Sequence, residues 1–265
     1  MLRACVRVLV LTGALAVAAP CAAQDRPFVF SITTSEASTN QAVVYLDSAF
    51  GEHPFNVSGE AGAVQQVVGV QASIGQRWTI LADAGFAPTE QVNGTTVHSE
   101  LLVSILSGPQ HGISLAAGGG VRHEWSGIDV LIGRVTAGKT WSTSRLAGNV
   151  VFEHPIAAVG RDALDLTTTV GWTARVSRAV SVGVEGIGED LEGFWDPDEA
   201  EGGARMLVGP SLHVAGAKSK WQVTVTGGPL FHVDANPRSS DATRLLPPQQ
   251  VQTGYAVRGS VAFAF

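Results

Sequence analysis

Apolar and polar residues alternate along most of the chain beyond residue 40, and the alternation is clearest at its end. One parity of the last eleven residues is apolar or aromatic with one glycine, and the other is small or polar with one arginine: Tyr255, Val257, Gly259, Val261, Phe263 and Phe265 against Ala256, Arg258, Ser260, Ala262 and Ala264. Successive side chains of a strand point to opposite faces. The pattern therefore predicts a strand with one apolar face.

Similar segments recur every twenty or so residues and predict about twelve strands, within a range of about 10 to 14. The expected strands cover residues 41–50, 55–74, 77–87, 96–107, 112–124, 129–141, 145–154, 164–176, 180–185, 205–214, 221–232 and 255–265. Short turns alternate with generally longer connections, as in outer-membrane barrels with periplasmic turns and extracellular loops. The predicted fold class is all-β, an up-and-down antiparallel transmembrane β-barrel.

The beginning of the chain has a different pattern. Arg3 and Arg7 precede an apolar stretch from Val8 to Ala19, and small residues follow it. This order is typical of a secretory signal peptide, which we expect over residues 1–24. Residues 25–40 are then expected to form an N-terminal periplasmic segment, and residues 41–265 the barrel domain. No run of eighteen apolar residues follows residue 24, so no transmembrane helix is expected.

Composition narrows the function classes. Removing Arg3 and Arg7 with the signal peptide leaves 15 of the 17 basic residues against 23 acidic ones. This acidity argues against a nucleic-acid partner, which would require a basic surface. Both cysteines, Cys5 and Cys21, also leave with the signal peptide, so we expect neither disulfides nor thiol chemistry in the mature chain.

Tryptophans fall near the predicted strand ends. Trp78, Trp141 and Trp221 lie beside short turns, while Trp125 and Trp195 lie at or in connections on the other side. Tryptophan favours the membrane–water interface because its ring is apolar and its N–H is polar. The positions favour two interfacial aromatic girdles over ordinary core tryptophans.

Together, the signal peptide, the amphipathic strands and the terminal aromatic strand resemble Gram-negative outer-membrane β-barrel proteins of the porin-like class, without pointing to one family. The resemblance implies the outer membrane as location, with its lipid and lipopolysaccharide as partners. It also implies that the barrel-assembly machinery reads the last strand, with Tyr255, Phe263 and Phe265 as the assembly signal.

The parity opposite the apolar one supplies the candidate lumen-lining residues, because charges facing lipid are costly. They are Asp83, Glu100, Arg122, Arg134, Glu153, Asp165, Arg175, Glu185, Arg205 and Arg258, joined by Glu189, His98, His213 and His232. Lys139 departs from this rule, and we expect it at the short-turn rim beside Trp141. The near-balanced charges fit either an ion-pair network that fills the interior or a polar pathway. Many small residues on the inner parity favour a narrow opening.

Residues 233–252 form an unusually long connection that contains Arg238 and Arg244. Such length is typical of functional or disordered loops. The loop is a candidate constriction, with both arginines near the entrance, and plain disorder is the alternative.

The sequence gives little support for a catalytic site. His98 and Ser99 are neighbours in a predicted strand and point to opposite faces, so they cannot pair directly. Glu52-His53-Pro54 and Glu153-His154-Pro155 lie at predicted strand ends. They can be interpreted as a hydrolase site at the rim of the barrel, and the alternative is turn sequence that repeats by coincidence. No metal or cofactor is expected, and the protein is not expected to be an enzyme. We expect a narrow passive channel for small hydrophilic solutes, with a non-conducting structural or surface-interaction barrel as the alternative.

Overall fold

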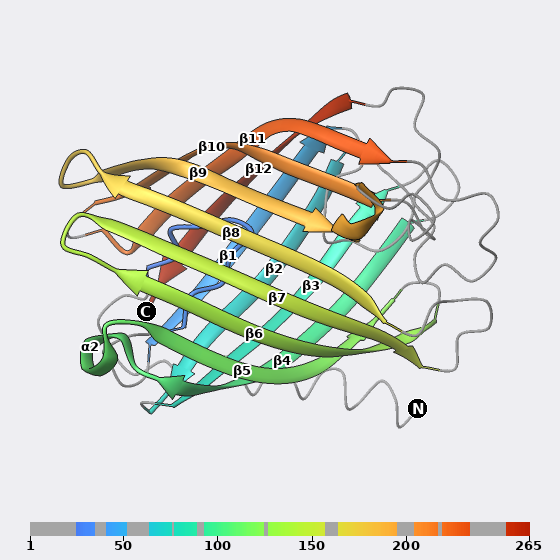
Figure 1. Cartoon of the computed structure of the whole chain (residues 1–265), viewed down its shortest axis with the longest axis horizontal. Coiled ribbons are helices and arrows are strands. Elements are labelled where there is room, and N and C mark those ends of the chain that lie inside the picture. The colour runs from blue at the N-terminus through green and yellow to red at the C-terminus, as the bar shows by residue number, and fades with distance from the viewer. Residues whose placement is uncertain are drawn as a thin grey trace.

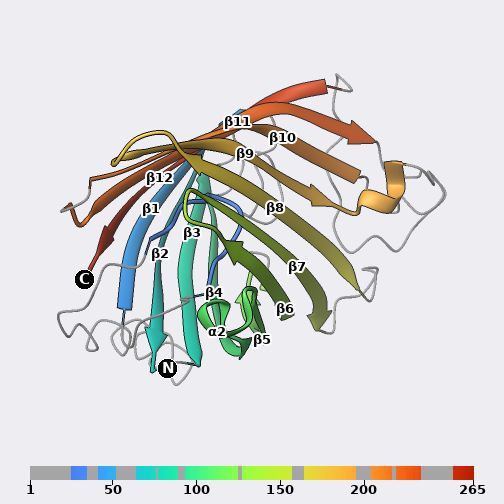
Figure 2. The ribbon, with the colours of Figure 1, turned by 60° about the vertical axis from the view of Figure 1, so that its left-hand side comes forward.

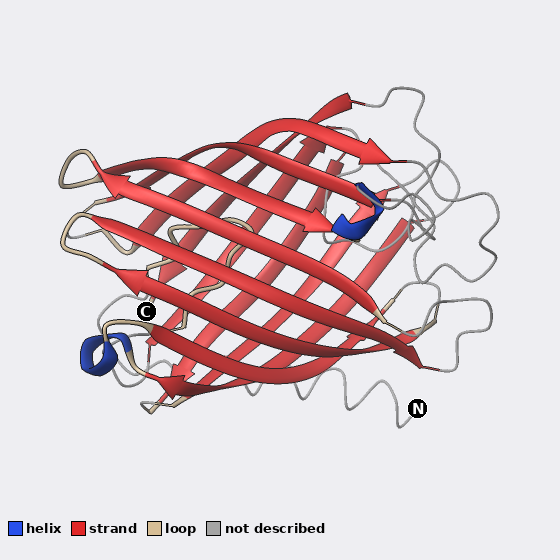
Figure 3. Cartoon of the chain, in the orientation of Figure 1, coloured by secondary structure: helices blue, strands red, loops and turns tan. Residues whose placement is uncertain are grey.

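Twelve antiparallel strands close into one barrel, because the last strand pairs with the first (Figures 1 and 3). The computed structural model describes residues 25–34, 41–51, 64–75, 77–88, 93–124, 127–156, 164–194, 204–216, 219–233 and 253–265. The strands are β1 (Gln41–Gly51), β2 (Val64–Ile74), β3 (Trp78–Pro88), β4 (Asn93–Leu106), β5 (Ser114–His123), β6 (Asp129–Thr140), β7 (Ser144–Ile156), β8 (Asp165–Arg175), β9 (Val180–Glu189), β10 (Ala204–Ala215), β11 (Trp221–Val233) and β12 (Thr253–Ala264). The predicted fold class and strand number are confirmed.

Strand boundaries agree with the alternation except where its signal fades. β9 continues to Glu189, beyond the predicted end at residue 185. Gly186 and Gly188 occupy its outward face there, so the apolar parity disappears from the sequence while the strand continues. The part of the expected second strand before Val64 lies outside the described residues. A short helix, α2 (Gly108–His111), lies in the turn between β4 and β5, and a 3₁₀ turn, η1 (Leu191–Phe194), follows β9.

Within the described ranges, no helix combines the length and hydropathy needed to cross a membrane.

The outward face of the barrel is an apolar belt between two rings of aromatic side chains. The ring near the short turns contains Trp78, Trp141, Trp172 and Trp221, and the ring near the other end contains Phe50, Phe86, Phe152, Phe231 and Tyr255. Exposed valines and leucines fill the space between them. A continuous apolar surface of this kind is the hallmark of a barrel surrounded by lipid. Trp125 and Trp195 lie outside the described residues.

Lys139 has the position that the sequence predicts. It lies on the outward face at the short-turn end of β6, and its Nζ is 5.3 Å from the centroid of the Trp141 ring. A lysine at this depth costs only about 0–1 kcal/mol, because its ammonium group reaches the interface.

The C-terminal strand joins this short-turn aromatic ring. The Phe265 N–H donates to the carbonyl oxygen of Ala42 at 2.9 Å. The Phe263 ring packs edge-on against Trp221 at a centroid distance of 4.8 Å and against Phe265 at 5.0 Å. The end of the chain therefore closes the barrel and contributes to its interfacial surface.

Candidate functional site

Residues 25–34 lie inside the barrel (Figures 1 and 2, dark blue). The expected periplasmic location of residues 25–40 is therefore wrong for this part, and residues 35–40 lie outside the described ranges. The reason is hydrophobic burial. Phe28 and Phe30 are 0% and 6% exposed, and Pro27 and Val29 are buried with them. The segment lacks strand periodicity, so the sequence pattern does not assign these apolar side chains to the lumen.

Arg26 anchors the first part of the segment. Its guanidinium donates to both carboxylate oxygens of Asp47 at 2.7 and 3.0 Å and to the Ser260 hydroxyl at 2.7 Å. Arg258 binds the same carboxylate from β12 at 2.7 Å. Burial by itself lowers the pKa of Arg26, but the adjacent Asp47 carboxylate outweighs it and raises that pKa above its ordinary value.

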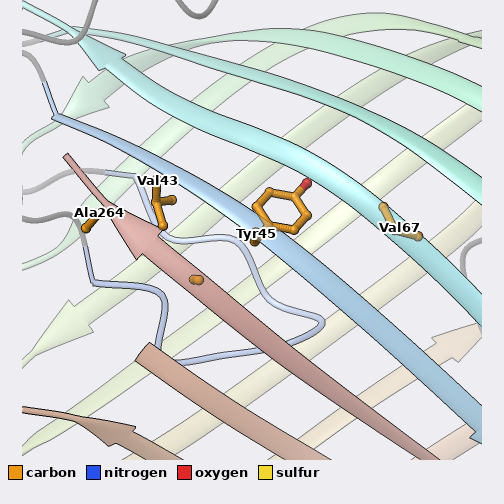
Figure 4. Packing of buried hydrophobic residues seen from close by; sticks show 5 residues of the cluster. Val43, Tyr45, Val67 and Ala264 are labelled. Carbon is orange, nitrogen blue, oxygen red and sulfur yellow. The ribbon is translucent and has the colours of Figure 1, made fainter. Parts of the chain in front are cut away.

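Tyr45 forms the floor of the Arg26 site. The guanidinium carbon of Arg26 lies 3.6 Å from the ring centroid, a close cation–π contact. Gly69 on β2 makes this ring position available, since a Cβ at that glycine would lie 2.3 Å from the ring. Figure 4 shows Tyr45 and Val43 on β1 beside Val67 on β2 and Ala264 on β12, an inward-facing apolar cluster.

Glu185 holds the middle of the segment. Its carboxylate accepts three consecutive main-chain N–H groups, from Val29 at 3.0 Å, Phe30 at 2.6 Å and Ser31 at 2.8 Å. The Thr226 hydroxyl donates to it at 2.9 Å. Glu185 is fully buried. Such concave runs of N–H groups are favourable anion sites, here with a carboxylate of the barrel wall as the anion.

Side-chain amides and a hydroxyl bind the main chain on either side of Glu185. The Asn149 amide accepts from the Ile32 N–H at 2.8 Å and donates to the Ile32 carbonyl at 3.0 Å. At the other end, the Arg26 N–H donates to Gln222 at 2.7 Å, and the Thr224 hydroxyl donates to the Arg26 carbonyl at 3.0 Å. Wall side chains thus bind both the N–H and the C=O of Arg26, and likewise both groups of Ile32.

Two aromatic rings of the segment, those of Phe28 and Phe30, pack against the barrel wall. Phe28 packs over Gly171 on β8, where a Cβ would lie 2.4 Å from the ring. Phe30 is buried in a cluster from β9 to β12 formed by Ile187, Leu207, Leu230 and Ala256. Gly171, a small inward residue of β8, therefore provides the space that the Phe28 ring occupies.

Asp25 lies where the segment enters from the short-turn end. It forms an ion pair with Arg145, and its Oδ1 lies 3.0 Å from His213 Nε2, without hydrogen-bond alignment of these two atoms. Burial raises the pKa of Asp25, but His213 and Arg145 together outweigh this and hold it below its ordinary value.

The opposite wall carries a charged chain that spans β3 to β6. His98 lies between two carboxylates, with Nδ1 2.8 Å from Asp83 and Nε2 2.6 Å from Glu100. Arg134 binds Glu100 through Nε at 2.7 Å and Nη2 at 2.6 Å. Farther along, Arg122 binds both oxygens of Glu153 at 2.8 and 2.6 Å. The side chains of Asp83, His98, Arg122 and Arg134 keep 11–21% exposure inside the closed barrel.

The remaining sequence-derived candidates divide by position. Asp165 and Arg205 are buried on the inward faces of β8 and β10, and Arg205 Nε lies 2.5 Å from Glu189. Arg175 is exposed at the short-turn end of β8. Arg238 and Arg244 lie outside the described residues, so the constriction loop stays a prediction. Sequence reasoning missed Arg26, Asp47 and Asn149, although Asp47 is a lone charge among the alternating residues of its strand.

The catalytic patterns within the described residues do not assemble, and Glu52-His53-Pro54 lies outside those residues. His98 faces the lumen, while Ser99 is on the outward parity of β4. Glu153 faces the lumen and binds Arg122, while His154 is exposed on the outer face. Among the described residues, no group of three or more His, Cys, Asp or Glu side chains is arranged to hold a metal ion.

Comparison with known proteins identifies the fold alone. No protein-family model and no curated protein matches the chain. The structure of the KdgM porin in complex with disordered oligogalacturonate is similar, with a TM-score of 0.54, 10% identity, and coverage of 84% of this chain and 99% of that one. The NanC porin gives a TM-score of 0.51, 8% identity and coverage of 83% and 98%. The chain has the fold of porin-like outer-membrane barrels.

Proposed function

We propose that this protein is an outer-membrane channel that passes small hydrophilic solutes along the inward faces of β3 to β6, beside the segment formed by residues 25–34. One observation carries the proposal. Asp83, His98, Arg122 and Arg134 face the interior of a closed barrel and still keep 11–21% exposure. Inward side chains of a closed barrel are exposed to the lumen or to its openings, so this exposure supports a water-filled path. Charged side chains bordering water form a polar path.

The membrane location is supported by the outer surface and by the fold. The apolar belt and the two aromatic rings match the lipid-facing surface of outer-membrane barrels. The similar KdgM and NanC structures are both porins.

The arrangement of charges favours neutral or zwitterionic solutes over the acidic oligosaccharide named with KdgM. The two arginines of this path are bound by carboxylates: Arg134 by both oxygens of Glu100, and Arg122 by both oxygens of Glu153 and one of Glu124. They alternate with acids around the path, so they create a transverse field rather than a continuous basic track.

A non-conducting barrel is the second candidate, and the segment inside the lumen favours it. Residues 26–33 occupy mid-lumen positions that an open pore would leave to water.

Single-channel recording in a planar bilayer separates the two candidates. The chain from residue 25 onward would be refolded in detergent, and a gel shift between unboiled and boiled samples would confirm the barrel. A channel gives discrete conductance steps that scale with salt concentration, whereas boiled protein gives none. Folded protein that inserts and never conducts would contradict the channel and support the second candidate.

A further inference from the structure

We infer that the barrel wall carries a binding site for an extended peptide with a basic residue followed by aromatic residues, and that residues 25–34 are its internal ligand. The inference goes beyond the proposed channel, since peptide binding does not require the barrel to conduct.

Main-chain recognition is the first argument. Wall side chains bind the N–H groups of Arg26, Val29, Phe30, Ser31 and Ile32 and the carbonyls of Arg26, Ile32 and Thr33. These partners come from β2, β7, β9 and β11, as they would around a bound peptide. The Asn149 amide binds both the N–H and the C=O of Ile32, so one side chain recognises the donor and the acceptor of one residue in an extended chain.

Side-chain subsites are the second argument, because they give the site a sequence preference. The Arg26 subsite combines the Asp47 carboxylate, the Ser260 hydroxyl and the face of Tyr45. This combination suits a planar guanidinium better than a lysine ammonium. The Phe28 subsite is the space over Gly171, and the Phe30 subsite is the apolar cluster around Ile187 and Leu207.

The wall itself is the third argument. Every subsite residue named here belongs to a strand of the closed barrel, and the strands pair with one another without using the segment. The site should therefore persist when the segment is absent or weakened. Glu185 would then lose its three main-chain donors and keep the Thr226 hydroxyl, and a peptide N–H run can supply the missing donors again.

The test uses a variant that lacks residues 25–34 and keeps all twelve strands. The probe is a fluorescent synthetic peptide with the sequence of residues 25–34, and a scrambled peptide is the control. In detergent, fluorescence anisotropy should show saturable binding of the first peptide and at least about tenfold weaker binding of the second. Glu185→Gln in the same background should weaken binding by about tenfold, since it replaces charge-assisted hydrogen bonds by neutral ones.

A full-length variant guards against failure of the deletion variant to fold. Arg26→Ala, Phe28→Ala and Phe30→Ala together weaken the internal ligand and leave the wall intact, so the labelled peptide should bind this variant. Thr33→Ala, which leaves the bound main chain in place, is the matched control and should exclude the peptide as the unaltered chain does.

Several outcomes would overturn the inference. The inference would be contradicted if the deletion variant folds but does not bind the peptide saturably. It would also be contradicted if the scrambled peptide binds equally well. Displacement of the probe by oligogalacturonate at the same concentration as by unlabelled peptide would indicate a general polar groove. Because anisotropy does not depend on ion flow, these results stand apart from the bilayer test of the channel.

Discussion

The covered wall of the lumen, formed by the inward faces of β8 to β12 and β1, differs from the facing wall, formed by β3 to β6, in what its charged groups contact. Asp47 and Glu185 on the covered wall bind residues 26–31, and both carboxylates are buried. Asp83 and Arg134 on the facing wall are linked through His98 and Glu100 and keep some exposure.

The comparison teaches that inward charges in one barrel serve two purposes. On the covered wall they replace water around a chain segment, and on the facing wall they neutralise one another beside water. Alternation along a strand predicts that these residues face inward, but it does not distinguish the two purposes. The difference depends on a segment that lies outside the strands.

Removing the segment should have the largest effect on this difference. Deleting residues 25–34 exposes the covered wall, so we expect single-channel conductance to rise by a factor of about two or more as the water-filled section widens. Planar-bilayer recording measures the change. Equal conductance in the folded deletion variant would mean that the segment does not limit the path.

Adding a single methyl group at Gly171 should destabilise the packing on the covered wall while the segment stays in the chain. Gly171→Ala places a Cβ 2.4 Å from the Phe28 ring, so overpacking should lower the free energy of unfolding by about 1–3 kcal/mol. Denaturant unfolding followed by gel mobility measures it. Gly259→Ala is the matched control, because its Cβ has 3.9 Å to its nearest neighbours, and it should stay within about 0.5 kcal/mol. Equal losses in both variants would contradict the packing of Phe28 over Gly171.

Removing one arginine from each wall should sharpen the contrast. Arg134→Gln leaves Glu100 and Asp83 beside the path, so the potassium-to-chloride permeability ratio should rise by about twofold. Arg258→Gln removes a buried partner of Asp47, which keeps Arg26, and should change the ratio little. Reversal potentials in a salt gradient measure both. A larger shift for Arg258→Gln would reverse the assignment of the two walls.

The smallest expected effect is a pH dependence at the entry of the segment. The folded-state pKa of Asp25 is depressed, so its contribution to holding the segment is complete above its ordinary value of 3.8 and is lost as pH falls through the folded value. Arg145 and His213 are the titratable groups that face it. A polarity-sensitive dye on Thr33→Cys should report loosening only below about pH 4. Asp25→Asn should remove this transition, and its persistence there would assign it to another group.

The strands were predictable because the membrane enforces a regular pattern. Lipid on one side and a polar interior on the other leave apolar residues at alternate positions, as in Val257 and Val261 against Arg258 and Ser260. The signal weakens where glycine takes the outward positions, as at Gly186 and Gly188.

The segment inside the lumen was not predictable in the same way. Arg26 binds Asp47 and Ser260, which are 21 and 234 residues away, and no local period encodes such contacts. The apolar run from Pro27 to Phe30 was a signal for burial that alternation does not capture. Nothing in the local pattern around Gly171 indicated that the Phe28 ring would pack over it.

Disulfide cross-linking tests the position of the segment most directly, since both cysteines of the chain precede residue 25. The Ser31 hydroxyl lies 3.1 Å from Thr169 Oγ1, so Ser31→Cys with Thr169→Cys should cross-link nearly completely on mild oxidation of the folded barrel. Ser31→Cys with Ser48→Cys, where Ser48 is on the outward face of β1, should not cross-link. A cross-link in the first pair alone places residue 31 in the lumen against β8, and its absence in a heat-modifiable barrel would contradict the account.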